Sequence, residues 1–113
     1  MQSDERPFLL TSTWMFMRHG QRLRARALCE ALHEDDPRDG VAAAALAELL
    51  LDDSDAARAI EVLHGADMPD SLAHVAAVLE TRALKMLGRT VESAARWRRY
   101  LESRKGAARQ WMA

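Results

Sequence analysis

The residues with catalytic or metal-binding chemistry are few and widely spaced in this sequence. The histidines, His19, His33, His64 and His74, have no partner at the i, i+4 spacing of a helical metal site. The five glycines stand alone, so there is no glycine-rich phosphate loop and no Gly-x-Ser-x-Gly nucleophile motif. We therefore expect a protein that is not an enzyme and that holds no metal and no cofactor.

The single cysteine, Cys29, points the same way. One cysteine cannot form an internal disulfide, which fits a reducing compartment. It lies in an apolar helical segment, and this position predicts a buried, inert thiol. The acidic pairs Asp35-Asp36 and Asp52-Asp53 fall in turns, where helix capping accounts for them without catalysis.

The elements that carry these residues are predicted to be helices. The chain has one isoleucine and five valines among many alanines and leucines, which excludes a mainly β fold. Glycine, proline and aspartate clusters mark the turns, and Asp39 stands where it would cap the third helix. We predict helices over 5–19, 22–34, 40–52, 55–64, 70–87 and 90–105. The tail at 106–113 either packs back onto the last helix, contacts a partner or is disordered.

A repeat of about 34 residues underlies these helices. Gly20 and Gly88 lie 68 residues apart, twice the period of the tetratricopeptide helix–turn–helix unit. Asp52 takes the glycine position of the middle unit, and Lys105 stands where the last unit would have proline. We predict an all-α fold of three degenerate tetratricopeptide-like helical hairpins in a short curved solenoid. The hairpins span about 5–37, 38–69 and 70–105 of a single domain, 1–113. A generic helical bundle is the alternative.

The charge is distributed unevenly along the chain. Residues 30–70 carry twelve acids against two arginines, whereas residues 89–113 carry seven bases against two acids. Solvated helix faces are the simplest explanation. The basic segment 96–100 includes Trp97 and Tyr100, a mixture that also occurs in nucleic-acid-binding proteins. We expect no nucleic-acid partner, because a helix here would turn Trp97 inward and Arg98 and Arg99 outward.

The compartment is predicted from the apolar segments. The first seven residues are polar and unlike a signal peptide. The longest apolar run, 41–51, contains Glu48 and is too short to cross a bilayer. We therefore expect a cytoplasmic protein with no direct membrane insertion.

In a helical-repeat solenoid the first helix of each unit lines the concave face, which receives a segment of another protein. The first predicted helix is apolar almost all round, so some of its side chains are expected to face a groove or a partner. The alternative is that all of them belong to the core. An exposed apolar groove also makes a homodimer plausible when the partner is absent. The predicted partner-binding residues are Leu10, Trp14, Met17, Ala42, Leu46, Leu49, Val75, Val78 and Arg82, with Lys85 at the rim.

The chain resembles a family of small type III secretion chaperones, the SctY (YscY) class. The resemblance covers about residues 8–103 and rests on short motifs. They are Phe8-Leu9-Leu10 with Trp14, His19-Gly20 with Ala25 and Leu28, Ala31-Leu32 with Asp36-Pro37, Leu87-Gly88-Arg89, and Ala95-Arg96 with Tyr100-Leu101-Glu102.

The resemblance implies a non-enzymatic chaperone at the inner-membrane secretion apparatus. Such a protein binds an SctX-like secreted partner and engages the cytoplasmic domain of the export gate protein SctV. The apolar groove residues would then bury against SctX, and Arg82 would pair with a carboxylate or a helix C-terminus. The alternatives are a needle-subunit co-chaperone of the SctG class and a general tetratricopeptide adaptor.

Overall fold

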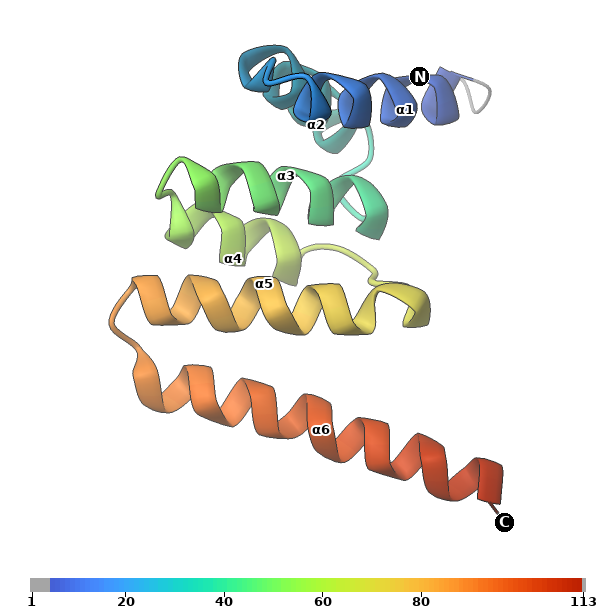
Figure 1. Cartoon of the computed structure of the whole chain (residues 1–113), viewed down its shortest axis with the longest axis vertical. Helices are drawn as coiled ribbons and strands as arrows, with labels where there is room; N and C mark the ends of the chain where they lie inside the picture. Colours follow the sequence, from blue (N-terminus) through green and yellow to red (C-terminus); the bar gives the residue numbers. More distant parts are fainter. Residues whose placement is uncertain (1–4, 113) are drawn as a thin grey trace.

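The computed structural model describes residues 5–112 of the chain and shows an all-α protein (Figure 1). Ala113 of the predicted tail lies outside the described residues. The helix bounds agree with the sequence prediction to within about two residues, apart from the start of α5 and the end of α6. In chain order the elements are α1 (Glu5–Arg18), α2 (Arg22–Asp35), α3 (Gly40–Asp52), α4 (Ala56–His64), the 3-10 turn η1 (Asp70–Leu72), α5 (Ala73–Met86) and α6 (Thr90–Met112).

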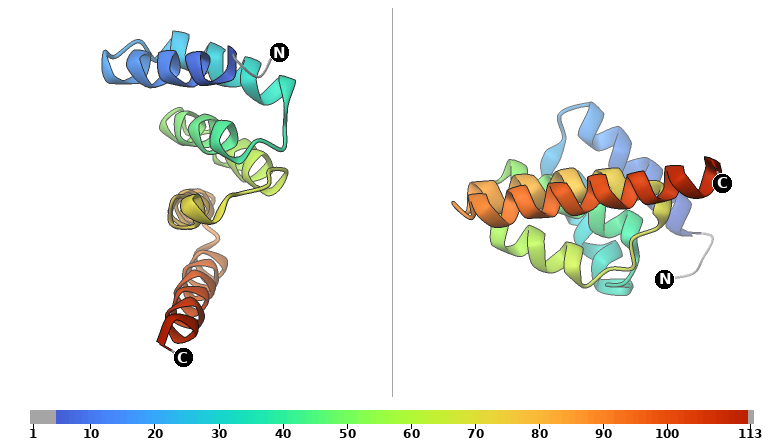
Figure 2. Two further views of the ribbon diagram at one scale, coloured as in Figure 1. Left: turned by 90° about the vertical axis from the view of Figure 1, so that its right-hand side faces the viewer. Right: turned by 90° about the horizontal axis from the view of Figure 1, so that it is seen from below.

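The helices pack mainly on their neighbours in the sequence. Successive helices run in alternating directions and lie in layers from α1 and α2 to α6 (Figures 1 and 2). The most extensive contacts join α1 to α2, α3 to α4, and α5 to α6. Helices α2 and α3 connect the first pair to the second. The second pair meets the third through α4 and α5 and also through α3 and α5.

The turns within the three helix pairs share one backbone conformation. Gly20, Ser54 and Gly88 each have a positive φ, at 73°, 64° and 75°, and each lies 34 residues after the previous one. The residue that follows each of them donates its backbone N–H to a carbonyl five residues earlier, at 2.7 to 2.9 Å. This arrangement satisfies carbonyls that a helix C-terminus leaves open. Ser54, and not Asp52 as the sequence predicted, occupies the glycine position of the middle turn.

Helix α3 forms the centre of the core. Nine of its thirteen residues are buried, and Leu46 and Leu50 are fully enclosed. Residues of α2, α4 and α5 complete the same cluster. As predicted, Asp39 caps the helix, its carboxylate accepting the backbone N–H groups of Val41 and Ala42 at 3.1 and 3.3 Å.

The two connections between helix pairs meet at Gly40, the first residue of α3. The backbone N–H of Asp67 donates to the carbonyl of Arg38 at 2.8 Å, and the two side chains form a bidentate pair. A Cβ on Gly40 would lie 2.4 Å from the carbonyl oxygen of Asp67 and 2.7 Å from Pro69. Only glycine therefore fits here without displacing the loop before α5.

The prediction that the last helix ends at residue 105 and is followed by a separate tail is wrong. Helix α6 continues through 106–112 to Met112, and it extends away from the other helices (Figure 1). Trp111 is 91% exposed and Met112 is 88% exposed, so this end does not pack back onto the helix stack. Arginine, lysine and alanine are good helix formers, which explains the continuation despite Gly106.

None of the helices in residues 5–112 is both long enough and apolar enough to cross a membrane.

Candidate partner-binding surface

Three of the predicted binding residues belong to the core. Ala42, Leu46 and Leu49 of α3 are fully buried, so their prediction as part of an open groove is wrong. Helix α3 is packed by other helices on most of its circumference, and these side chains fill the space between them. They can change partner binding only by changing the fold.

The exposed side of α3 lies one residue earlier in register. Val41, Glu48 and Asp52 are exposed and Ala45 is half-buried, and these positions form a single stripe at i, i+4, i+7 and i+11. The one-residue difference is a rotation of about 100° around the helix. The sequence signal was the polar pair itself, because Glu48 and Asp52 mark the only polar side of an otherwise apolar helix.

Helix α5 places its predicted residues on the surface. Val75, Val78, Arg82 and Lys85 are all exposed and follow one another along one side of the helix. The last three line a hollow of about 380 Å³, together with Thr81 and Trp97. Valine and indole surfaces beside two cations would suit a segment with an apolar anchor and a nearby carboxylate.

An ion pair joins the two stripes. Arg82 of α5 donates to a carboxylate oxygen of Asp52, the last residue of α3, at 3.3 Å. Helices α3 and α5 also pack directly against each other. The exposed residues of α3 and α5 therefore form one surface, the α3–α5 face, made of Val41, Ala45, Glu48, Asp52, Val75, Val78, Arg82 and Lys85.

Helix α1 holds the other predicted residues, and it packs chiefly on α2. Leu10 and Met17 are half-buried, and Met17 packs against the core. Trp14 is 57% exposed, with the Arg18 guanidinium 4.9 Å from its ring centre. The 34-residue period relates Trp14 to Glu48 and Arg82, so all three occupy equivalent exposed positions. The role of the α1 residues in binding stays a prediction.

Ion pairs between arginines and the acidic middle of the chain tie the helix pairs together. Arg22 and Arg26 of α2 both reach Asp53 at 2.6 Å, in the turn after α3. Arg58 of α4 forms a bidentate pair with Glu30 of α2. The hydrogen bond from Arg58 holds the pKa of Glu30 below its usual value, and the hydrogen bond from Arg26 does the same for the pKa of Asp53. Part of the acidic middle is thus neutralised within the chain.

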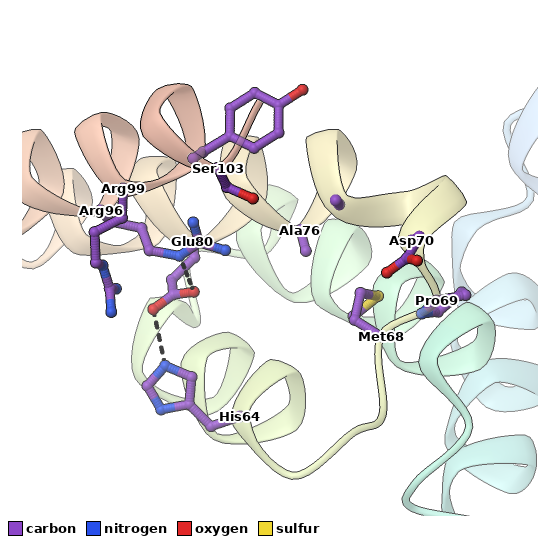
Figure 3. Close-up of a pocket in the computed structure, with 11 residues that line it drawn as sticks. His64, Met68, Pro69, Asp70, Ala76, Glu80, Arg96, Arg99 and Ser103 are labelled. Atoms are coloured by element: carbon purple, nitrogen blue, oxygen red, sulfur yellow. Dashed lines mark hydrogen bonds and ion pairs between the residues drawn. The ribbon is translucent and has the colours of Figure 1, made fainter. Parts of the chain in front are cut away.

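A second hollow, of about 440 Å³, lies beside α5 and α6 on a different side (Figure 3). Glu80 of α5 accepts hydrogen bonds from His64 Nε2 at 2.9 Å and from Arg96 Nε at 2.7 Å. Burial raises the pKa of Glu80, but these two bonds outweigh it and leave the pKa below the usual value. Figure 3 shows Glu80 between its partners. The three groups satisfy one another, so this hollow contains an inter-helix clamp that sequence spacing alone did not reveal.

Cys29 is buried, as the sequence predicted. Burial raises the pKa of its thiol to about 11, although a hydrogen bond with Thr13 works against the rise. The thiol is therefore protonated near neutral pH and is a poor nucleophile. Within residues 5–112, no group of three or more histidine, cysteine, aspartate or glutamate side chains is placed to hold a metal ion.

Comparison with known proteins gives no match to this chain among family models, curated proteins or solved structures.

Proposed function

We propose that this chain is a protein-binding module of three tetratricopeptide-like helical hairpins that receives a segment of a partner on its α3–α5 face. The observation that carries the proposal is the row of exposed Val75 and Val78 next to a hollow lined by Trp97, Arg82 and Lys85. Apolar side chains grouped around a hollow are typical of surfaces that another polypeptide covers.

The repeat assignment is supported by the turns within the helix pairs. Gly20, Ser54 and Gly88 have the same left-handed conformation at intervals of 34 residues, the length of a tetratricopeptide unit. The period also relates Val41 to Val75, and both are exposed. This pair of positions has the same exposure in the second and third helix pairs, as expected for a repeat protein.

On the basis of the sequence resemblance, we propose that the partner is an SctX-like secreted protein. The chain would act as a cytoplasmic chaperone of the SctY class and would bring this partner to the cytoplasmic domain of an SctV-like export gate. Covering the apolar face would keep both proteins from aggregating before export. We expect neither nucleic acid nor a membrane to bind the α3–α5 face.

In the proposed mechanism, apolar groups supply the affinity for the partner and charged groups set its position. An aliphatic or aromatic side chain of the partner would fill the hollow beside Val78 and Trp97, where the removal of apolar surface from water supplies the affinity. A carboxylate of the partner would pair with Lys85, or with Arg82 in place of Asp52. Such charges fix the register and the orientation more than they raise the affinity.

The test is co-expression of the chain with the SctX-like protein and, separately, with the SctG-associated needle subunit from the same genome. We expect a stable complex with the SctX-like protein, measured by co-purification and by isothermal titration. Val78→Asp should weaken that complex by tenfold or more, because it places an acid at the edge of the hollow. Leu23→Asp, at an exposed apolar position of α2, is the matched control and should leave binding unchanged.

The variant Trp14→Ala determines whether α1 belongs to the binding surface. A loss of affinity with unchanged helicity adds α1 to the α3–α5 face, whereas unchanged affinity removes Trp14. Equal binding by Val78→Asp and the parent chain would contradict the proposed face. A complex with the needle subunit alone would replace the SctX-like partner by the SctG-class function, and binding to neither would leave the general adaptor.

A further inference from the structure

One side of α6 carries a seam of side chains whose second half, beyond residue 100, no other part of residues 5–112 covers. The seam begins inside the protein, where Ser93 donates its hydroxyl to the carbonyl of Thr81 at 2.9 Å. Its next two members, Trp97 and Tyr100, contact His74, the second residue of α5, with ring centres 6.2 and 5.6 Å away. At this point α6 has reached the start of α5.

The same side of α6 then continues beyond α5. Every residue from 101 to 112 is exposed, and the helix extends past the end of its neighbour (Figures 1 and 2). A 4-3 spacing is that of helices packed side by side. The residues at this spacing are Ser93, Trp97, Tyr100, Arg104, Ala107 and Trp111, and Leu101, Ala108 and Met112 flank them. The exposed seam thus prolongs an interface that already joins two helices.

The charges between residues 97 and 112 are almost all positive. Glu102 is the only acid between residues 97 and 112. In the part of the chain that the structure describes, none of the five bases forms an ion pair, whereas Arg96 one turn earlier is paired with Glu80. The five bases are Arg98, Arg99, Arg104, Lys105 and Arg109.

We propose that residues 101–112 of α6 form a second docking site, separate from the α3–α5 face, for an acidic amphipathic helix of another protein. The apolar side of that helix would cover Leu101, Ala108 and Trp111, and its glutamates or aspartates would pair with the flanking bases. Helices recognise each other in this way through apolar anchors at i, i+3, i+4 and i+7. Charge complementarity sets the partner and its direction.

The positions of the charges favour a protein helix over the two other occupants. Arg104 lies on the seam itself, between Tyr100 and Trp111, whereas a helix that lies on a membrane keeps its cations on the polar side. A second copy of α6 would bring five bases against five bases. Two acids of a second copy, Glu30 and Asp53, are already paired with its own arginines, and self-association through its other acids is an outcome of the test below.

The test uses the full chain and a displayed library of amphipathic helices with a fixed apolar face. The flanking positions of the library members are randomised between glutamate and lysine. We expect selection for glutamate at those positions. A selected peptide should bind Trp111→Ala and Lys105→Glu about tenfold more weakly than the parent chain. Binding should also weaken as salt rises.

Two controls separate this site from the proposed α3–α5 face. Val78→Asp and Leu23→Ala should bind the selected peptide as the parent does, even where Val78→Asp loses the SctX-like partner. The docking site would be overturned if the library yielded no binder, or if the binders showed no preference for glutamate. It would also be overturned if the selected peptide bound Trp111→Ala as tightly as the parent chain, or bound Val78→Asp more weakly.

Two further outcomes would assign this surface to another occupant. They are stronger binding of the chain to phosphatidylglycerol vesicles than to the peptide, and self-association in sedimentation that Trp111→Ala abolishes.

Discussion

Helices α3 and α6 are built from similar proportions of helix-forming residues, yet they have opposite places in the molecule. Nine of the thirteen residues of α3 are buried, whereas Ser93 is the only buried residue among those described in the twenty-three of α6. The free energy of folding is therefore concentrated around α3, because apolar burial is the main stabilising contribution. Exposed side chains of α6 contribute little to stability and remain free to contact another molecule.

The largest expected difference between the two helices is in large-to-small substitutions. Leu46→Ala removes a fully enclosed side chain of α3, and we expect it to lower the free energy of unfolding by about 2–5 kcal/mol. Trp111→Ala removes a larger but exposed side chain, and we expect a change within about 0.5 kcal/mol. Urea unfolding followed by circular dichroism measures both. Similar losses for the two variants would show that the end of α6 is packed in solution.

Glycine-to-alanine substitutions should differ in sign between the helices. Gly40→Ala in α3 would bring a Cβ against the backbone of Asp67, so we expect a loss of about 1–3 kcal/mol. A Cβ on Gly106 in α6 meets no atom within 4 Å, and Gly106→Ala should gain about 0.5–1 kcal/mol through helix propensity. Thermal melts of both variants should show a lower melting temperature for Gly40→Ala and a higher one for Gly106→Ala. A stabilising Gly40→Ala would mean that the loop before α5 yields easily.

The connection of α6 to the rest of the molecule should depend on pH. Its first half is joined to α4 and α5 by Glu80, whose pKa in the folded chain lies below the ordinary value of 4.5. The Glu80 carboxylate therefore binds a proton more readily in the unfolded chain than in the folded chain. The contribution of Glu80 is complete above about pH 4.5 and is lost as the pH falls toward the lower folded value.

We expect Glu80→Gln to lower stability at pH 7 by about 1.5 kcal/mol, because it weakens hydrogen bonds to Arg96 and His64. The variant should also lose less stability than the parent chain between pH 5 and pH 3. Parallel slopes in urea titrations at these pH values would contradict this role of Glu80. Trp111→Ala, which leaves the clamp intact, should keep the slope of the parent.

Local patterns predicted the helices well because their ends depend on nearby residues. Asp39 as a cap and Gly20 and Gly88 as turn residues act within a few positions of themselves, through hydrogen bonds and a backbone conformation that glycine adopts easily. The 34-residue spacing was also visible, but the middle turn was misplaced at Asp52. The residue with a positive φ in that turn is a serine, Ser54, so no glycine marks the position in the sequence.

The exposed surface was harder to predict than the helices. The predicted residues of α5 are exposed, because Arg82 and Lys85 mark the polar side of that helix, and their role in binding stays a prediction. The predicted exposed side of α3 was wrong by one residue. Alanine and leucine occupy almost every position of that helix, so only Glu48 and Asp52 mark its exposed side. Applying the 34-residue period to Trp14 or to Arg82 gives Glu48 in both cases, which would have corrected the register.

The sequence by itself determined that the chain is helical and where most of the helices begin and end, because these depend on residues that are close together in the chain. Only the tertiary structure decided which sides of α3 are covered, that Glu80 joins three helices, and that the end of α6 stands uncovered. Burial and ion pairing depend on residues distant in the sequence. Their proximity results from how the whole chain packs.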